Sequence, residues 1–178
     1  MGGGLWVVVV LDAVTASILL IAGMAKAVSP GQLGQALAEL PVVRNGVSTG
    51  AVRGLAGVEI ATALLLPVPP VRVVAAVAAG VLGLGFVGAG LAGWLGGSTT
   101  ACGCFGSRGG RPLGPVNVAA GVLVIVSAAV TVRAPAAADP AHYFRICVVG
   151  IALATLCLCL WTHRGLIREL TRPLSSSR

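Results

Sequence analysis

The stretch "LWVVVVLDAVTASILLIAGMAKA", residues 5–27, is apolar or small along almost its whole length and carries only two charged side chains, Asp12 and Lys26. A helix of roughly 17–25 apolar residues crosses a bilayer core of about 30 Å. No basic segment precedes the run, and its apolar part is longer than the core of a signal peptide. The stretch therefore predicts a first membrane span rather than a cleaved leader.

The composition extends this interpretation to the whole chain of 178 residues. Apolar residues make up 57% of it, charged residues only 10%, and the mean hydropathy is +1.00. The surface of a soluble domain needs more charge than this. No basic run is interleaved with aromatic residues, so the net charge of +7 indicates membrane topology rather than nucleic-acid binding. The fold class predicted is all-α, an integral membrane helical bundle.

Five segments approach the length of a membrane span, and Trp6, Trp94 and Trp161 lie near their ends, as interfacial aromatic residues do. One transmembrane domain over 1–162 is therefore expected, followed by a basic polar tail over 163–178. The spans are expected at about 5–27, 50–66, 72–97, 116–133 and 144–162.

Two connectors have patterns of their own. After the first span, Ser29 and Pro30 are typical of a helix start, and helical spacing of apolar residues continues until Pro41. This predicts a short amphipathic helix at the membrane interface. The proline-rich turn "PVPPVR", residues 67–72, predicts an antiparallel hairpin of the second and third spans.

The third span is rich in glycine. Gly83, Gly90 and Gly97 recur every seven residues and would line one helix face. Small residues allow membrane helices to approach closely, so a packing face is expected, with a substrate-lining groove as the alternative.

Three charged residues of the first two predicted spans are candidates for a polar site, namely Asp12, Lys26 and Glu59. Asp12 and Glu59 are each about seven residues from the same membrane surface, because their spans run antiparallel. Carboxylates at this depth are costly unless they are paired, protonated or hydrated, so they indicate either a proton-handling site or hydrogen bonds to neighbouring helices. Lys26 is near a span end, where its side chain can extend to the interface.

The polar loop between the third and fourth spans holds Cys102, Gly103 and Cys104. Two cysteines separated by one glycine can close a strained disulfide, which suits thiol–disulfide exchange, and Arg108 and Arg111 would favour a thiolate. An inert structural pair and a metal site are the alternatives, although a tetrahedral metal needs four ligands. Three further cysteines in the last span suit buried apolar positions: Cys147, Cys157 and Cys159.

Two arguments disagree about the side of the membrane on which the cysteine loop lies, namely the distribution of basic residues and the expected disulfide chemistry. With five spans, nine basic residues share the side of this loop and three lie on the other, which places the loop in the cytoplasm. Disulfide chemistry prefers the outside. A peripheral or re-entrant segment 144–162 would largely remove the charge bias, so the orientation stays open.

Several motifs in order resemble the methylamine utilisation protein MauE family, a DoxX-like group of small redox-associated membrane proteins. They are "AGMAKAVSP", "GVEIATALLL", and "CGCFG" followed by "PLGPVN", within about residues 10–132. The resemblance implies a four-helix membrane core, here with a fifth C-terminal span. It also implies a role in maturing the disulfide-rich small subunit of methylamine dehydrogenase, beside a thioredoxin-like partner. The family pattern includes Lys26, Glu59, Cys102, Gly103, Cys104, Phe105, Gly106 and Asn117.

The sequence thus predicts a multi-pass protein of the bacterial cell membrane whose loop exchanges disulfides with a thiol partner. Cys102 and Cys104 form the redox pair, Gly103, Phe105 and Gly106 shape the loop, and Asn117 follows it. Glu59, with Lys26 or Asp12, provides a polar binding site in the bundle. No cofactor or metal is expected, with a quinone as the alternative, and turnover as an enzyme stays open. The rival hypothesis is a non-catalytic membrane chaperone or small transporter with structural cysteines.

Overall fold

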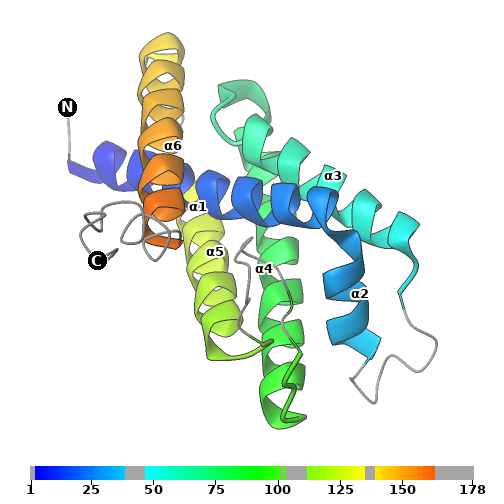
Figure 1. The fold of residues 1–178 in the computed structure, drawn as a ribbon. Coiled ribbons are helices and arrows are strands. Elements are labelled where there is room, and N and C mark those ends of the chain that lie inside the picture. The colour runs from blue at the N-terminus through cyan, green and yellow to red at the C-terminus, as the bar shows by residue number, and fades with distance from the viewer. Residues whose placement is uncertain (1–2, 39–46, 101, 103–111, 135–138, 163–178) are drawn as a thin grey trace, which may run out of the picture.

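The computed structural model describes residues 3–38, 47–100, 102, 112–134 and 139–162, and all its regular elements within these ranges are helical (Figure 1). A short 3-10 turn, η1 (Pro69–Val71), follows the third helix. The α-helices are α1 (Gly3–Val28), α2 (Pro30–Ala38), α3 (Thr49–Leu65), α4 (Arg72–Leu95), α5 (Pro115–Arg133) and α6 (Pro140–Thr162).

The all-α membrane fold is confirmed, including the C-terminal span. Four helical segments are long and apolar enough to cross a membrane, namely Trp6–Val28, Pro69–Leu95, Pro115–Arg133 and Pro140–Leu160. The predicted second span, 50–66, is also a helix, but α3 has 17 residues and is not among these four. Its length of about 25 Å is slightly less than the hydrocarbon core.

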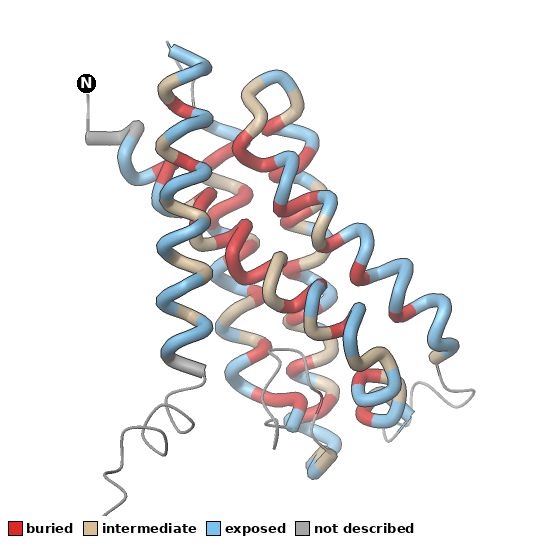
Figure 2. Tube along the Cα trace, turned by 45° about the horizontal axis from the view of Figure 1, so that its top comes forward, coloured by how far each residue is buried: buried red, intermediate tan, exposed pale blue. Residues whose placement is uncertain are grey.

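Helix α1 lies at the centre of the bundle and packs against α2, α3, α5 and α6. It is the most enclosed of the four long segments, whereas α6 is the least enclosed. In Figures 1 and 2, α1 and α3 lie side by side and cross the α4–α5 pair obliquely. The predicted hairpin at "PVPPVR" is present, because α3 ends at Leu65, η1 turns the chain, and α4 begins at Arg72.

The most extensive helix contact joins α4 to α5 and depends on glycine. A Cβ atom on Gly121 would lie 2.6 Å from the carbonyl oxygen of Gly83, and one on Gly90 would lie 2.9 Å from the nitrogen of Val118. No side chain larger than hydrogen fits between these backbones. The predicted packing face is therefore confirmed at Gly83 and Gly90.

The same prediction is wrong for Gly97, because α4 ends at Leu95. Gly97 has φ +64° instead of a helical value. Its N–H bonds the carbonyl of Trp94 at 3.3 Å, and the N–H of Ser98 bonds that of Gly93 at 2.9 Å. These two bonds form a Schellman motif, for which glycine is the preferred residue.

Helix α2 begins at Pro30, as its start signal predicts, but it packs against the protein instead of lying only on the lipid interface. Leu33 and Ala36 are buried in one cluster with Val52, Cys102 and Leu113. The first connector, the start of α3 and the cysteine loop therefore meet at one end of the bundle, here called the cysteine end.

Helix α6 begins at the opposite end with a capped turn. The backbone N–H of His142 donates to the Asp139 carboxylate at 3.0 Å, and this bond lowers the pKa of Asp139 below its usual value. A lowered pKa in the folded protein means that the cap stabilises the helix above the ordinary pKa of aspartate. Its contribution is lost as the pH falls through the folded pKa.

Candidate functional site

Cys102 is buried at the cysteine end, with 4% of its surface exposed. The side-chain amide of Asn117 donates to its sulfur, with 3.8 Å between Nδ2 and Sγ. Asn117 is equally buried and comes from the first turn of α5, which begins at Pro115. The structure thus joins two of the residues that sequence analysis selected, and it places the Cys102 sulfur beside a helix N-terminus.

The position of Asn117 depends on the glycine face of α4. A Cβ atom on Gly90 would lie 3.0 Å from the Asn117 Cβ, so the absence of a side chain at Gly90 leaves room for the amide. Leu113 and the α2 residues Leu33 and Ala36 belong to the same buried cluster as Cys102. The cluster around Cys102 therefore includes residues of α2 and α3, with α4 packed against it and α5 supplying the amide donor.

The remaining predicted loop residues, Gly103, Cys104, Phe105 and Gly106, lie outside the described residues, as do Arg108 and Arg111. No disulfide is seen within the described part of the chain. Pairing of Cys102 with Cys104 therefore stays a prediction. Of the α6 cysteines, Cys147 is buried as expected, whereas Cys157 and Cys159 are exposed on the surface of the bundle.

Lys26 and Glu59 form a buried ion pair between α1 and α3. The Lys26 ammonium lies 2.7 and 2.8 Å from the two Glu59 oxygens and 3.4 Å from the carbonyl of Ala22. The side chains are 3% and 1% exposed. Lys26 therefore does not extend to the interface as its position near the helix end predicts, because Glu59 and the Phe86 ring, 5.0 Å away, hold it inside.

This ion pair lies beneath the cysteine end. Phe86, which contacts Lys26, is one turn of α4 before Gly90, which contacts Asn117. On α3, Glu59 is two turns beyond Val52, which packs in the Cys102 cluster. Along α3 and α4, one or two helical turns thus separate the residues at the ion pair from residues that pack near Cys102 and Asn117.

Asp12 belongs to a second buried polar centre at the opposite end of the bundle. It accepts hydrogen bonds from Thr131 of α5, at 2.5 Å, and from the Tyr143 hydroxyl of α6. The Arg72 guanidinium lies 5.3 Å from the Tyr143 ring and donates to the Ala134 carbonyl at 3.3 Å. Asp12 and Glu59 thus have different partners, although the sequence placed both at one depth.

Sequence analysis missed Thr131, Tyr143 and Arg72 as members of this centre. Tyr143 is the single tyrosine of the chain and directly precedes the predicted fifth span, so its position offered little reason to place its hydroxyl inside the bundle, whereas the observed α6 already begins at Pro140. Arg72 is buried, with 4% exposed, whereas the sequence suggested a connector charge. Nothing in the sequence indicates that Thr131 pairs with a residue 119 positions earlier.

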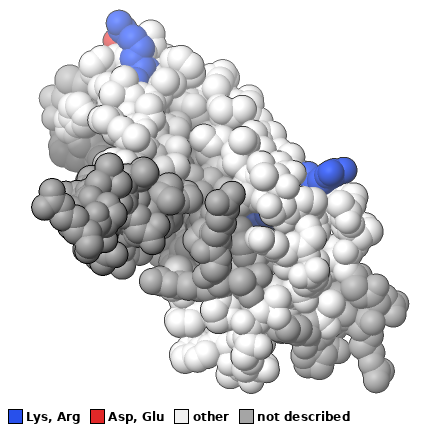
Figure 3. All heavy atoms as spheres, in the orientation of Figure 1, with Lys and Arg blue, Asp and Glu red and all other residues white. Residues whose placement is uncertain are grey.

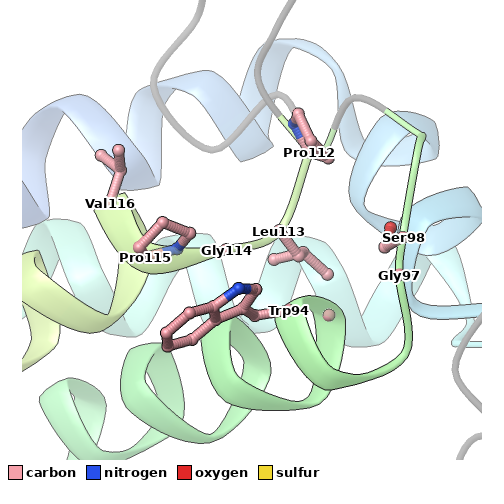
Figure 4. A pocket seen from close by; sticks show the side chains of 9 residues that line it. Trp94, Gly97, Ser98, Pro112, Leu113, Gly114, Pro115 and Val116 are labelled. Atoms are coloured by element: carbon pink, nitrogen blue, oxygen red, sulfur yellow. The ribbon is translucent and has the colours of Figure 1, made fainter.

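A pocket of 340 Å³ opens at the root of the cysteine loop, between the end of α4 and the start of α5 (Figure 4). Trp94 and Pro115 lie close together on one side of it, and Leu113 connects it to the cluster around Cys102. Trp94 is 60% exposed, as expected of an interfacial aromatic residue. On the face drawn in Figure 3, charged atoms appear mainly in two separate places, with uncharged surface between them.

Comparison with known proteins agrees with the motifs described above. The family model described as methylamine utilisation protein MauE matches residues 5–134, which is most of the chain. The match includes Lys26, Glu59, Cys102 and Asn117, and it ends before α6 and Tyr143. No curated protein and no solved structure matches the chain significantly.

Proposed function

The chain belongs to the MauE family, and from this membership we propose that it supports thiol–disulfide exchange at the surface of the bacterial cell membrane. Through this exchange it assists the maturation of an exported, disulfide-containing client. The family description names methylamine utilisation, so the client proposed first is the small subunit of methylamine dehydrogenase. A thioredoxin-like protein is the proposed exchange partner.

The observation that carries the proposal is the environment of Cys102. Its sulfur lies at a membrane-proximal helix start and contacts an amide N–H, which stabilises a thiolate better than apolar packing alone. An inert cysteine in an apolar core needs no such donor. Cys104, two residues further along the chain, supplies the second sulfur.

The exchange uses the two cysteines, a partner dithiol supplied by the client, and a disulfide protein that reoxidises the two cysteines. A partner thiolate attacks one sulfur of the Cys102–Cys104 disulfide, forms a mixed disulfide and releases the other sulfur as a thiolate. The second partner thiol then attacks the mixed disulfide. The partner leaves oxidised, Cys102 and Cys104 are left reduced, and a disulfide protein of the thioredoxin type returns them to the oxidised form.

The Lys26–Glu59 pair is proposed to keep the base of this site polar and rigid. Ionisable residues buried in membrane helices are costly and mark functional positions by default. Both Glu59 oxygens are occupied by one ammonium group, so the pair fixes α1 against α3 directly below the cysteine end.

The proposal requires that the loop face the oxidising side of the membrane, because an exported client forms its disulfides there. This conflicts with the positive-inside rule, which places the basic residues in the cytoplasm. Because Lys26 and Arg72 are buried, each side of the membrane has one solvent-facing basic residue fewer, and the side of the cysteine loop still has the larger number. The test must therefore also show that the cysteine loop faces the outside of the cell.

The test counts thiols with maleimide on intact cells, in a background with alanine at Cys147, Cys157 and Cys159. Two loop thiols should become reactive only after reduction: a membrane-impermeant maleimide should reach Cys104 on the cells, whereas Cys102, which is buried, should be labelled fully only when the reduced chain is then denatured. A chain with a single cysteine at Gly31 in place of the two loop cysteines is the matched control, since Gly31 is exposed in α2 at the cysteine end and reduction should not alter its label. Labelling of Cys102 and Cys104 that reduction leaves unchanged would contradict the proposal and favour a chaperone or transporter with structural cysteines.

A further inference from the structure

Helix α6 buries little of its own surface against the bundle. Among its described side chains only Tyr143 and Cys147 are buried, and the helix is the least enclosed of the four long segments. Lipid chains are as apolar as leucine, so an apolar helix gains little hydrophobic energy from one position over another in the membrane. A feature other than apolar burial must therefore select the position of α6 on α1.

The Tyr143 side chain joins two charged residues of other helices. Its hydroxyl donates to the Asp12 carboxylate of α1, whose other oxygen accepts from Thr131 at 2.5 Å. The Arg72 guanidinium at the start of α4 lies 5.3 Å from the centre of its ring. The tyrosine thus contacts an anion with its hydroxyl and a cation with its ring face, and both interactions depend on direction.

Two further contacts between α6 and α1 do not distinguish one register from the next. Ser17 donates to the Ile151 carbonyl at 3.2 Å, and every position of a helix has such a carbonyl. Gly150 permits close approach, because a Cβ atom there would lie 3.0 Å from the Ala13 Cβ, but this contact contains no directional bond. The bond from Tyr143 to Asp12, by contrast, forms in one register only.

We propose that the Tyr143 hydroxyl is a register lock that selects one axial and rotational position of α6 on the bundle. A shift by one residue moves a helix by about 1.5 Å and turns it by about 100°. Such a shift takes the hydroxyl away from Asp12, which is 2% exposed, and leaves one carboxylate oxygen without its donor in surroundings that offer no water. One hydrogen bond therefore decides which faces of α6 meet the lipid.

The lock also joins two parts of the chain that differ in their relation to known proteins. The family match ends before α6, whereas Asp12 and Arg72 lie within it. Tyr143 thus fastens a helix from outside the matched region to buried charges inside it. This inference uses no residue of the cysteine loop and is independent of the proposed exchange function.

Disulfide crosslinking between α1 and α6 tests the lock on the full chain in its membrane. Val9 packs in one cluster with Tyr143 and Cys147, so Val9→Cys is combined with native Cys147 while the other four cysteines are replaced by alanine. Two parallel chains have alanine at 147 and the α6 cysteine at Ile146 or Val148. Copper phenanthroline is the oxidant, and mass spectrometry after thiol labelling in denaturant gives the crosslinked fraction. Crosslinking at 147 should be at least about tenfold faster than at its neighbours, the ratio that one hydrogen bond to a charged group supports.

Tyr143→Phe keeps the ring beside Arg72 and removes only the hydroxyl, so crosslinking at the three α6 positions should then proceed at comparable rates. Ser17→Ala is the matched control, because it removes a bond to a backbone carbonyl of α6 and should leave the preference for 147 unchanged. The double variant Asp12→Asn/Tyr143→Phe removes the buried anion together with its donor. It reports on the register even where Tyr143→Phe alone does not fold.

A preference for 147 that persists in Tyr143→Phe or in the double variant overturns the register lock. Loss of crosslinking at all three positions in both variants overturns it as well, because the hydroxyl would then hold α6 on the bundle without selecting its position. Comparable rates at the three positions in a chain that retains Tyr143 would show that α6 has no single register to lock.

Discussion

At the scale of single residues, the Lys26–Glu59 ion pair places two full charges in the interior of the bundle. Both charges are almost fully removed from solvent, and each is compensated chiefly by the other. Desolvation of two ions can exceed the attraction between them, so such a pair need not stabilise the fold relative to apolar residues. Removal of one partner, however, leaves a buried charge without compensation.

The double substitution Lys26→Met/Glu59→Leu is therefore expected to be more stable than the single substitution Glu59→Gln. Glu59→Gln should lower the free energy of unfolding by about 3–5 kcal/mol, measured by denaturant titration in detergent micelles. Arg53→Met, which removes an exposed cation of the same helix, serves as control and should have little effect. A double variant that is less stable than Glu59→Gln would show that the pair itself stabilises the protein.

The partners of the buried charged residues could not be predicted from the sequence. Hydropathy places a charge at a depth along its helix, and on that basis Asp12 and Glu59 appeared to be neighbours. It does not specify which face of a helix meets which neighbour. The partners of Asp12 follow it by 119 and 131 residues, and Glu59 follows Lys26 by 33, so only the packed bundle determines them.

At the scale of helices, close approach of α4 and α5 decides the architecture. Gly83, Gly90 and Gly121 bring the two backbones together, and this contact in turn presents Asn117 to the cysteine loop. The seven-residue glycine period was sufficient to predict the face of α4. It could not predict where the helix ends, because Gly97 continues the period but serves as a C-terminal cap.

Gly121→Ala should weaken the α4–α5 contact, because its Cβ would lie 2.6 Å from the Gly83 oxygen. A loss of about 1–3 kcal/mol in the free energy of unfolding is expected from the displacement of the helices. Gly85→Ala is the matched control, since a Cβ there meets nothing within 4 Å and alanine favours the helix. Equal stabilities of the two variants would contradict the close approach.

At the scale of the whole molecule, the direction of α3 determines the topology. Its Glu59 and Ala63 contact α1 residues, while its two ends lie near opposite ends of the bundle. Its 17 residues are few for a membrane span. If α3 nevertheless crosses the membrane, the connector after α1 and the turn after α5 face opposite sides.

Single cysteines at Gly31 and Arg133, introduced after replacement of the five native cysteines, test this arrangement. Both positions are exposed, and they lie at opposite ends of the bundle. An impermeant maleimide applied to intact cells should label one and spare the other, whereas a permeant maleimide should label both. Labelling of both by the impermeant reagent would mean that α3 returns without crossing.

The central position of α1 also has a consequence for biogenesis. Because this helix precedes the others in the chain, it enters the membrane with Asp12 and Lys26 before their partners have been synthesised. Lys26 is neutralised when α3 arrives, but Asp12 receives its second donor only from Tyr143 of α6. A chain that stalls before α6 would therefore leave the Asp12 carboxyl without the Tyr143 donor inside the membrane, so Asp12 links the completeness of the bundle to the arrival of its last helix.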